Sequence, residues 1–275
     1  MLKLRYDTTR VWLGGAPDEL RPAVAAAKRL AAEAGDRPFL AIVVLSECML
    51  HYMEGRCSGL LRAGDEALAL LDEYPSLELG ALPNPHQRIL FFRVSALALL
   101  GRAEAAGREW ERLLAAATEV YAIDPDALVS AHALRAFLSE WTGWDAEDAL
   151  AHARRAVEIA EQGASPLIRI FAYQALAKAR LHRGDWEEAL AAAERSQVIR
   201  HEAGTSVKSE GVALALTARA WLLLGNLERA RVLADEAVAS TRACGTLGDE
   251  IEARIARTRV LIGAGDGPAL ASQLA

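Results

Sequence analysis

The sequence predicts an all-α fold, a solenoid of about seven antiparallel helix pairs, on three grounds. The 275 residues are 52% hydrophobic but only 6% aromatic. Most of the hydrophobic share is Ala and Leu, which favour helices over strands. Glycines recur at a spacing of about forty-one residues, which indicates a repeated helix–turn–helix unit. Prolines lie at or near the expected helix ends, as suits a residue that breaks a helix interior.

The turn glycines define the repeat. They stand at positions 14, 55, 101, 143, 184, 225 and 265, so the intervals are 41, 46, 42, 41, 41 and 40 residues. The longest interval contains an extra loop at residues 74–85. Glycine suits such turns because it adopts positive φ without a Cβ penalty. A small residue follows about five positions later at Ala106, Ala189 and Ala230, where it allows two helices to approach closely.

Each unit contains two helices whose apolar residues follow a period of about 3.6. The first helices are expected at residues 3–13, 38–54, 86–100, 127–142, 166–183, 207–224 and 247–262. The second helices are expected at residues 18–35, 57–74, 102–122, 145–162, 185–202, 226–243 and 267–274. We interpret residues 1–275 as one domain. Neither end resembles a polar capping helix, so we expect either a fragment of a longer protein or a homodimer through the terminal helices.

Charge and composition argue against several partners. The net charge of −6 and the lack of a basic arm speak against direct nucleic-acid binding. The longest strongly apolar run, residues 39–45, is too short to span a bilayer, and the N-terminus lacks the apolar core of a signal peptide. Three scattered cysteines do not form a disulfide framework. We therefore expect a cytoplasmic protein that does not associate with membranes.

The motifs of enzymes and cofactor sites are weak or missing. Cys48, His51 and Cys57 form a C-x2-H-x5-C pattern that matches no common zinc spacing, so core packing is the favoured interpretation. Residues 263–267 (GAGDG) resemble part of a dinucleotide-binding loop, but they follow a predicted helix, which favours a turn. The sequence contains no GxxxxGK phosphate loop and no hydrolase motif. We expect no enzyme activity, cofactor or metal.

Two segments carry a family signature. Residues 176–190 (LAKARLHRGDWEEAL) and 217–231 (TARAWLLLGNLERAR) each read as a helix, a Gly-Asp or Gly-Asn turn and a second helix. They resemble tetratricopeptide repeats at Leu176, Ala177, Gly184, Asp185, Trp186 and Ala189, and at Ala218, Trp221, Gly225, Asn226, Leu227 and Ala230. The resemblance implies a right-handed α-solenoid in which Trp186 and Trp221 pack in the core.

The repeat departs from the family pattern in its length. A classical tetratricopeptide repeat has about 34 residues and a closing proline, whereas most units here lack that proline. Longer variants are similar to the helical regions of bacterial large ATP-binding regulators and adenylate cyclase-like proteins, in which the array senses a ligand or partner. HEAT-type repeats of about 40–47 residues are the structural alternative, and they are less favoured because they lack the Gly-Asp/Asn turn.

The resemblance also implies where a partner binds. In such arrays the first helices line the concave face, at about 13, 10, 6, 3 and 2 positions before each turn glycine. This spacing gives the candidate groove residues Arg88, Phe91, Phe171, Gln174, Lys178, His182, Arg219 and Leu222. Lys178 and Arg219 suit a carboxylate of a peptide or acidic ligand. The alternative is that both cations are solvated, or paired with Glu from the next repeat.

These observations predict a non-enzymatic scaffold that binds a protein or peptide in a concave groove. The alternative is a ligand-sensing module of a larger bacterial signalling or transcription-regulating protein, with a small-molecule effector. A nucleotide-binding or DNA-binding module next to this segment in its gene would favour the sensor. Charge reversal at Lys178 and Arg219 is expected to weaken partner binding while leaving the melting temperature near that of the wild type.

Overall fold

The computed structural model describes residues 17–73, 85–120, 122–204, 208–244 and 247–274, and these residues form helices joined by short turns. The helices are α2 (Pro17–Ala34), α3 (Arg37–Met53), α4 (Cys57–Glu73), α5 (Pro85–Leu99), α6 (Ala103–Glu119), α7 (Pro125–Thr142), α8 (Ala146–Ala160), α9 (Pro166–Arg183), α10 (Trp186–Ala203), α11 (Lys208–Leu223), α12 (Leu227–Cys244), α13 (Leu247–Gly263) and α14 (Gly267–Leu274). Each agrees with a predicted helix to within a few residues. The predicted helix at 3–13, Gly14 and most of the loop at 74–85 lie outside the described residues.

The predicted turn glycines adopt the conformation that explains their spacing. Six of them have positive φ, between 66° and 97°, at positions 55, 101, 143, 184, 225 and 265. At Gly143 and Gly184 the left-handed residue ends the first helix of its pair, and its backbone N–H donates to a carbonyl of the last turn. These glycines close the helix ends, so the period of the sequence is the period of the fold.

Prolines mostly start helices. Pro17, Pro85, Pro125 and Pro166 are the first residues of α2, α5, α7 and α9, where a missing N–H leaves no helix hydrogen bond unmade. Pro22 differs from the expectation, because it lies at the sixth residue of α2. Proline there removes one hydrogen bond of the helix.

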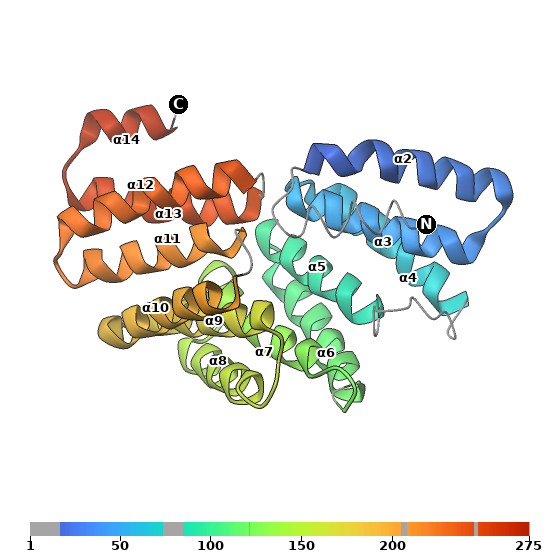
Figure 1. The fold of residues 1–275 in the computed structure, drawn as a ribbon, viewed down its shortest axis with the longest axis horizontal. Helices are drawn as coiled ribbons and strands as arrows, with labels where there is room; N and C mark the ends of the chain where they lie inside the picture. The colour runs from blue at the N-terminus through green and yellow to red at the C-terminus, as the bar shows by residue number, and fades with distance from the viewer. Residues whose placement is uncertain (1–16, 74–84, 121, 205–207, 245–246, 275) are drawn as a thin grey trace.

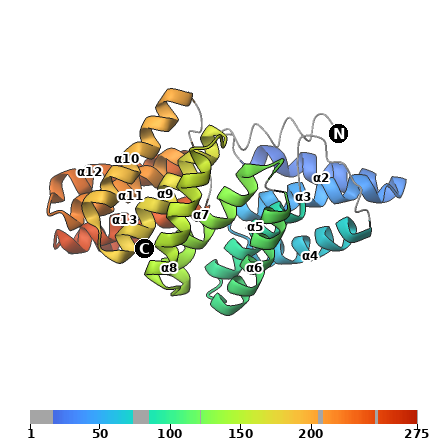
Figure 2. The same ribbon diagram turned by 90° about the horizontal axis from the view of Figure 1, so that it is seen from below.

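The first helices of the pairs contact one another in succession, from α3 through α5, α7, α9 and α11 to α13. The second helices pack against the first helices and form the outer layer, so α4, α6 and α8 follow one another along one edge (Figure 2). Small residues make this stacking close: Ala106, Ala189 and Ala230 are at most 1% exposed, as predicted. Buried apolar residues form one cluster from α5 to α11 and another from α2 to α5.

The two tryptophans expected in the core differ in their surroundings. Trp186 is 39% exposed, so the prediction that it packs in the core is wrong. It is the first residue of α10, and its indole lies over the turn at Gly184 instead of in the interface between helices. Trp221 is half-buried, with the Arg229 guanidinium 4.4 Å from its ring centroid.

The array curves until its two halves meet on the inner side (Figure 1). The start of α13 contacts the end of α3, although these helices are separated by about two hundred residues. A Cβ atom added at Gly55 would lie 2.2 Å from Cδ2 of Leu247, so glycine also allows this close approach. The curvature encloses the inner face of the first helices, where the candidate groove residues were expected.

Candidate functional site

The inner face contains a pocket of about 360 Å³, bounded by α3, α5, α7, α9, α11 and the start of α13. Six aromatic side chains of the described residues line it: Tyr52, Phe91, Phe92, Phe137, Trp141 and Phe171. Four of the candidate groove residues, Arg88, Phe91, Phe171 and Gln174, also line it. Its volume and its apolar wall with a few polar groups are typical of a binding site.

The aromatic rings form a connected cluster across three helices. Phe171 of α9 contacts Phe91 of α5 with ring centroids 6.0 Å apart, and Phe137 of α7 at 5.7 Å. Phe137 in turn contacts Trp141 at 6.3 Å, nearly edge to face. Phe91, Phe137 and Phe171 are half-buried, so each presents part of its ring to the pocket. An apolar group that entered would displace water from these ring faces, which stabilises binding.

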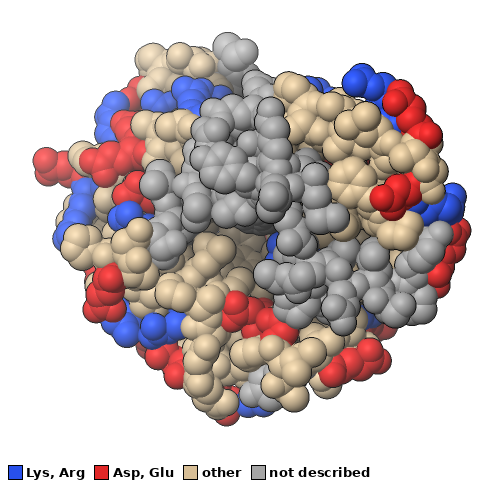
Figure 3. All heavy atoms as spheres, turned by 45° about the vertical axis from the view of Figure 1, so that its right-hand side comes forward, with Lys and Arg blue, Asp and Glu red and all other residues tan. Residues whose placement is uncertain are grey.

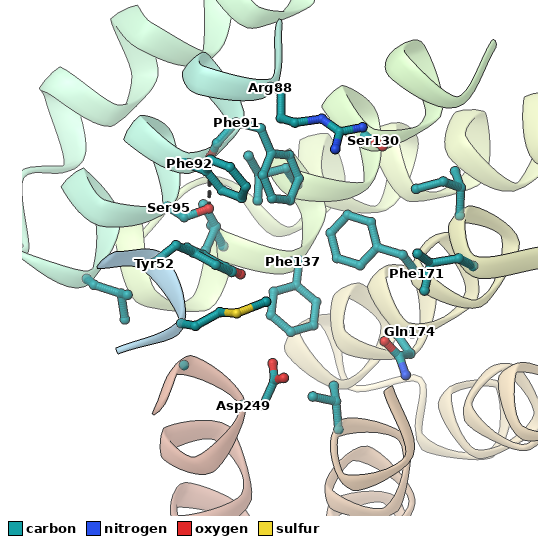
Figure 4. A pocket seen from close by; sticks show the side chains of 18 of the residues that line it. Tyr52, Arg88, Phe91, Phe92, Ser95, Ser130, Phe137, Phe171, Gln174 and Asp249 are labelled. Atoms are coloured by element: carbon teal, nitrogen blue, oxygen red, sulfur yellow. Dashed lines mark hydrogen bonds between the residues drawn. The ribbon is translucent and has the colours of Figure 1, made fainter. Parts of the chain in front are cut away.

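Charged residues mark the two ends of the pocket. Figure 4 shows Arg88 beside Ser130 at one end and Asp249 at the other, with the rings of Phe91 and Phe137 between them. Burial lowers the pKa of Arg88, and Asp124 opposes that shift through space. At the opposite end, burial and then the charge of Asp249 raise the pKa of the Tyr52 hydroxyl.

Lys178 and Arg219 belong to a buried ion-pair cluster next to the pocket. Lys178 Nζ lies 2.6 Å from Glu252 Oε2, and one Arg219 nitrogen lies 3.1 Å from Glu252 Oε1. A second Arg219 nitrogen lies 2.9 Å from Glu140 Oε1, which also binds Arg259 at 2.7 Å. The expectation that both cations face an open groove is wrong, because the carboxylate of Glu252 on α13 pairs with both of them.

Burial and neighbouring charges together shift the pKa values of this cluster. Lys178 is 0% exposed, and its ammonium lies 4.3 Å from the centroid of the Phe137 ring and 4.1 Å from that of Trp141. Burial lowers the pKa of Lys178, while Glu252 opposes the shift. Burial alone would raise the pKa of Glu140, but Arg219, Arg259 and Lys178 hold it at about 2. Phe137 and Trp141 therefore belong both to the pocket wall and to the cluster.

His182 and Leu222 lie away from the pocket. His182 Nδ1 lies 3.2 Å from the Ser139 hydroxyl, between α9 and α7. Leu222 packs in a small apolar cluster around Ala218, Ala230 and Val260. The predicted positions thus divide among the pocket, the ion-pair cluster and the packing between repeats.

The same spacing rule would have found residues that the sequence analysis missed. Among the positions that it gives are Ser130, Phe137, Glu140 and Trp141 from Gly143, Tyr52 and Met53 from Gly55, and Glu252 and Arg259 from Gly265. All of these line the pocket or form the cluster. Asp249 lies outside the rule, because it contributes through the approach of α13 to α3 and not through its place in a repeat.

The weak motifs have structural explanations. Cys48 is fully buried, and burial raises the pKa of its thiol to about 12, while Cys57 is half-buried. In the described parts of the chain, no three His, Cys, Asp or Glu side chains group as a metal site would require. Residues 263–267 form the turn between α13 and α14, as predicted.

The surface shows no single region of one charge on the face drawn in Figure 3, where acidic and basic side chains of the described residues alternate around the rim. None of the helices described combines the length and apolar character that crossing a membrane requires.

The comparisons with known proteins identify the fold. No protein-family profile matches the sequence, and no curated protein matches it. Similar solved structures include BtubC from P. vanneervenii (17% identity, TM-score 0.56, 87% of this chain and 91% of that one). A Rap protein in complex with competence and sporulation factor is also similar (14% identity, TM-score 0.62, 94% and 72%). A third is a signal-transduction ATPase with a tetratricopeptide repeat sensor from Pyrococcus horikoshii (17% identity, TM-score 0.55, 86% and 34%).

These identities are low, so the likeness concerns the fold alone. Kinesin light chain repeats from Podospora anserina, described as tetratricopeptide-like, share it as well. The chain therefore has the fold of a tetratricopeptide-like α-solenoid.

Proposed function

We propose that this chain is a non-enzymatic scaffold that binds a segment of a protein or peptide partner in its inner pocket. The observation that carries the proposal is the pocket itself, in which half-buried rings of Phe91, Phe137 and Phe171 face a cavity of about 360 Å³. Water-exposed aromatic surface of this kind is typical of interaction sites, because a partner side chain releases the water from it.

The similar structures support the proposal by analogy. The Rap protein with the same fold was solved in complex with competence and sporulation factor, so this architecture accommodates a bound factor. A site built from several successive repeats also suits an extended partner, because each first helix adds side chains to one continuous inner face.

Partner capture with a pocket variant tests this function. Phe171→Asp places a charge in the aromatic wall, whereas Val198→Asp places the same charge at a 43% exposed position of the outer helix α10. Partners that the wild type and Val198→Asp retain should be lost with Phe171→Asp, while circular dichroism confirms that both variants are folded. An identical set of captured partners for the two variants would exclude the pocket as the binding site.

A ligand-sensing module is the second candidate. It is favoured by the likeness to the ATPase with a repeat sensor, of which the chain covers 34%. A pocket of about 360 Å³ lies at the lower end of the range for small-molecule sites, about 300–1,000 Å³. A metabolite library screened by thermal shift separates the two functions, because a sensor should be stabilised by a compound in a Phe171-dependent manner. The homodimer through the terminal helices stays a prediction.

A further inference from the structure

We propose that the pocket recognises a carboxylate next to an apolar group, with the carboxylate bound by Arg88 and the apolar group held by the phenylalanines. This inference rests on the proposed function and names the chemistry of the segment that the pocket accepts. It also moves the expected anion site from Lys178 and Arg219, where the sequence placed it, to the other end of the inner face.

Arg88 differs in its partners from Lys178, Arg219, Arg93 and Arg135, which also lie on the inner helices. Lys178 and Arg219 share Glu252, Arg93 is paired with Asp65 and Glu109, and Arg135 is paired with Asp148. Among the residues that the structure describes, none forms an ion pair with Arg88.

The position of Arg88 makes a counter-ion from outside favourable. Its side chain is partly withdrawn from water, and its guanidinium remains charged at neutral pH. It lies in the first turn of α5, where the helix dipole adds positive potential instead of cancelling it. Asp124 acts on it only through space. A carboxylate would accept two parallel hydrogen bonds from the guanidinium, which is the strongest neutralisation open to this residue.

Charge balance favours a carboxylate over a phosphate. Arg88 is the one basic residue in the described lining of the pocket, and Asp249 stands at its far end. A carboxylate carries one negative charge and is neutralised by one guanidinium. A phosphate group would bring a further negative charge close to Asp124, and the described lining offers no second cation to receive it.

The aromatic cluster fixes what stands next to the carboxylate. Phe91 follows Arg88 by three residues on α5, so both side chains lie on one face of the helix. In Figure 4 the Arg88 guanidinium lies at the same end of the pocket as the rings of Phe91 and Phe171. A ligand whose carboxylate reaches Arg88 therefore extends directly over these two rings. A large apolar group within a few bonds of the carboxylate matches this arrangement.

Two parts of a partner protein supply such chemistry. One is a chain terminus that ends in a large apolar residue, and the other is an Asp or Glu side chain next to one. The probe is a library of random hexapeptides with free C-termini, screened for binding to the full chain. The strongest binder is then measured by calorimetry as the free acid, as the C-terminal amide, and with Asp and Glu replaced by Asn and Gln.

The proposal predicts that one of the two amide forms, the C-terminal amide or the peptide with Asn and Gln, loses about tenfold or more in affinity. The form that loses affinity identifies the source of the carboxylate. Arg88→Gln should lose about tenfold to a hundredfold, and Arg88→Lys less. Arg102→Gln, which removes an exposed cation outside the pocket lining, should bind as the wild type does. Arg88→Gln should melt at or above the wild-type temperature, because no ion pair is lost, whereas a structural role would lower it.

Three results would overturn the inference. If the peptide loses affinity with Phe171→Asp but not with Arg88→Gln, the pocket binds a partner without using Arg88, and only the proposed function stands. If both amide forms bind as tightly as the free acid, the pocket does not recognise a carboxylate. If no peptide from the library depends on Phe171, the proposed function fails together with the inference.

Discussion

The buried carboxylate of Glu252 provides the sharpest test of how the array is held together. Glu252 is 1% exposed and accepts hydrogen bonds from both Lys178 and Arg219. The change Glu252→Gln keeps the size of the side chain but removes the negative charge. Lys178 then stays fully buried without the carboxylate that opposes the burial-induced fall in its pKa, and Glu140 is a carboxylate that still acts on it.

The expected loss follows from the burial of the pair. Removing one partner of a buried ion pair costs about 3–5 kcal/mol, because the other charge is left without compensation. In a chain of this size, 1 kcal/mol corresponds to about 2–4 °C, so Glu252→Gln should lower the melting temperature by about 6–20 °C. Unfolding of the variant should begin at α13, since Glu252 joins α13 to α9 and α11 and each repeat is stabilised by its neighbours.

A surface ion pair of nearly the same length is the matched control. Arg155 and Glu158 lie 2.7 Å apart, but their side chains are 47% and 59% exposed. Surface pairs contribute about 0–1 kcal/mol, so Glu158→Gln should leave the melt almost unchanged. The assay is urea and thermal unfolding followed by circular dichroism.

The double variant with Lys178→Met separates pairing from packing. It removes the buried amine that has lost its partner, so it should recover part of the lost stability, with a coupling of about 0.5–3 kcal/mol between the two sites. If Glu252→Gln and Glu158→Gln unfold within about 1 kcal/mol of each other, the cluster does not hold α13 in place and the reasoning is refuted.

Three further predictions test other parts of the fold. His132 Nδ1 lies 2.7 Å from His152 Nδ1, and burial followed by His152 lowers the pKa of His132 to about 4, so stability should fall as the pH drops from about 6.5 to 4. The melting temperature of His132→Gln should depend less on pH over that range than that of the wild type. Ala230→Leu, at a 0% exposed contact, should cost about 1–3 kcal/mol, and a neutral melt would contradict the close stacking. Gly211→Ala places Cβ 2.3 Å from Thr241 Cγ2 and should lower the urea midpoint. Gly107→Ala, whose Cβ meets open space, should raise the free energy of unfolding by about 0.5–1 kcal/mol.

Helix ends could be predicted closely because their causes are local. A glycine at positive φ ends α7 and α9 at the expected positions, and prolines begin α5, α7 and α9. The buried alanines at 106, 189 and 230 also follow from the repeat, since a five-residue offset from the turn glycine fixes their place in the interface. Trp186 could not be placed this way, because a side chain in the first turn of a helix can lie either over the turn or in the interface.

The candidate site could be predicted only in part. The repeat spacing placed Arg88, Phe91, Phe171 and Gln174 on the inner face, and all four line the pocket. It also placed Lys178 there, but it could not show that Glu252 covers that residue. The alternative interpretation, pairing with Glu from the next repeat, holds for Arg219, which pairs with Glu252. Lys178 pairs with the same Glu252, which lies two repeats further along the chain.

The helices, the turns and the inward face of each first helix could be predicted from the sequence, because they depend on residues within one repeat. How far the array curves depends instead on contacts between repeats. That curvature brings Glu252 to Lys178 across 74 positions and Arg259 to Glu140 across 119. Small rotations between neighbouring pairs add up along the array, and no single repeat encodes their sum. The same curvature pairs the two cations that were expected in an open groove and leaves Arg88 as the basic residue in the described lining of the pocket.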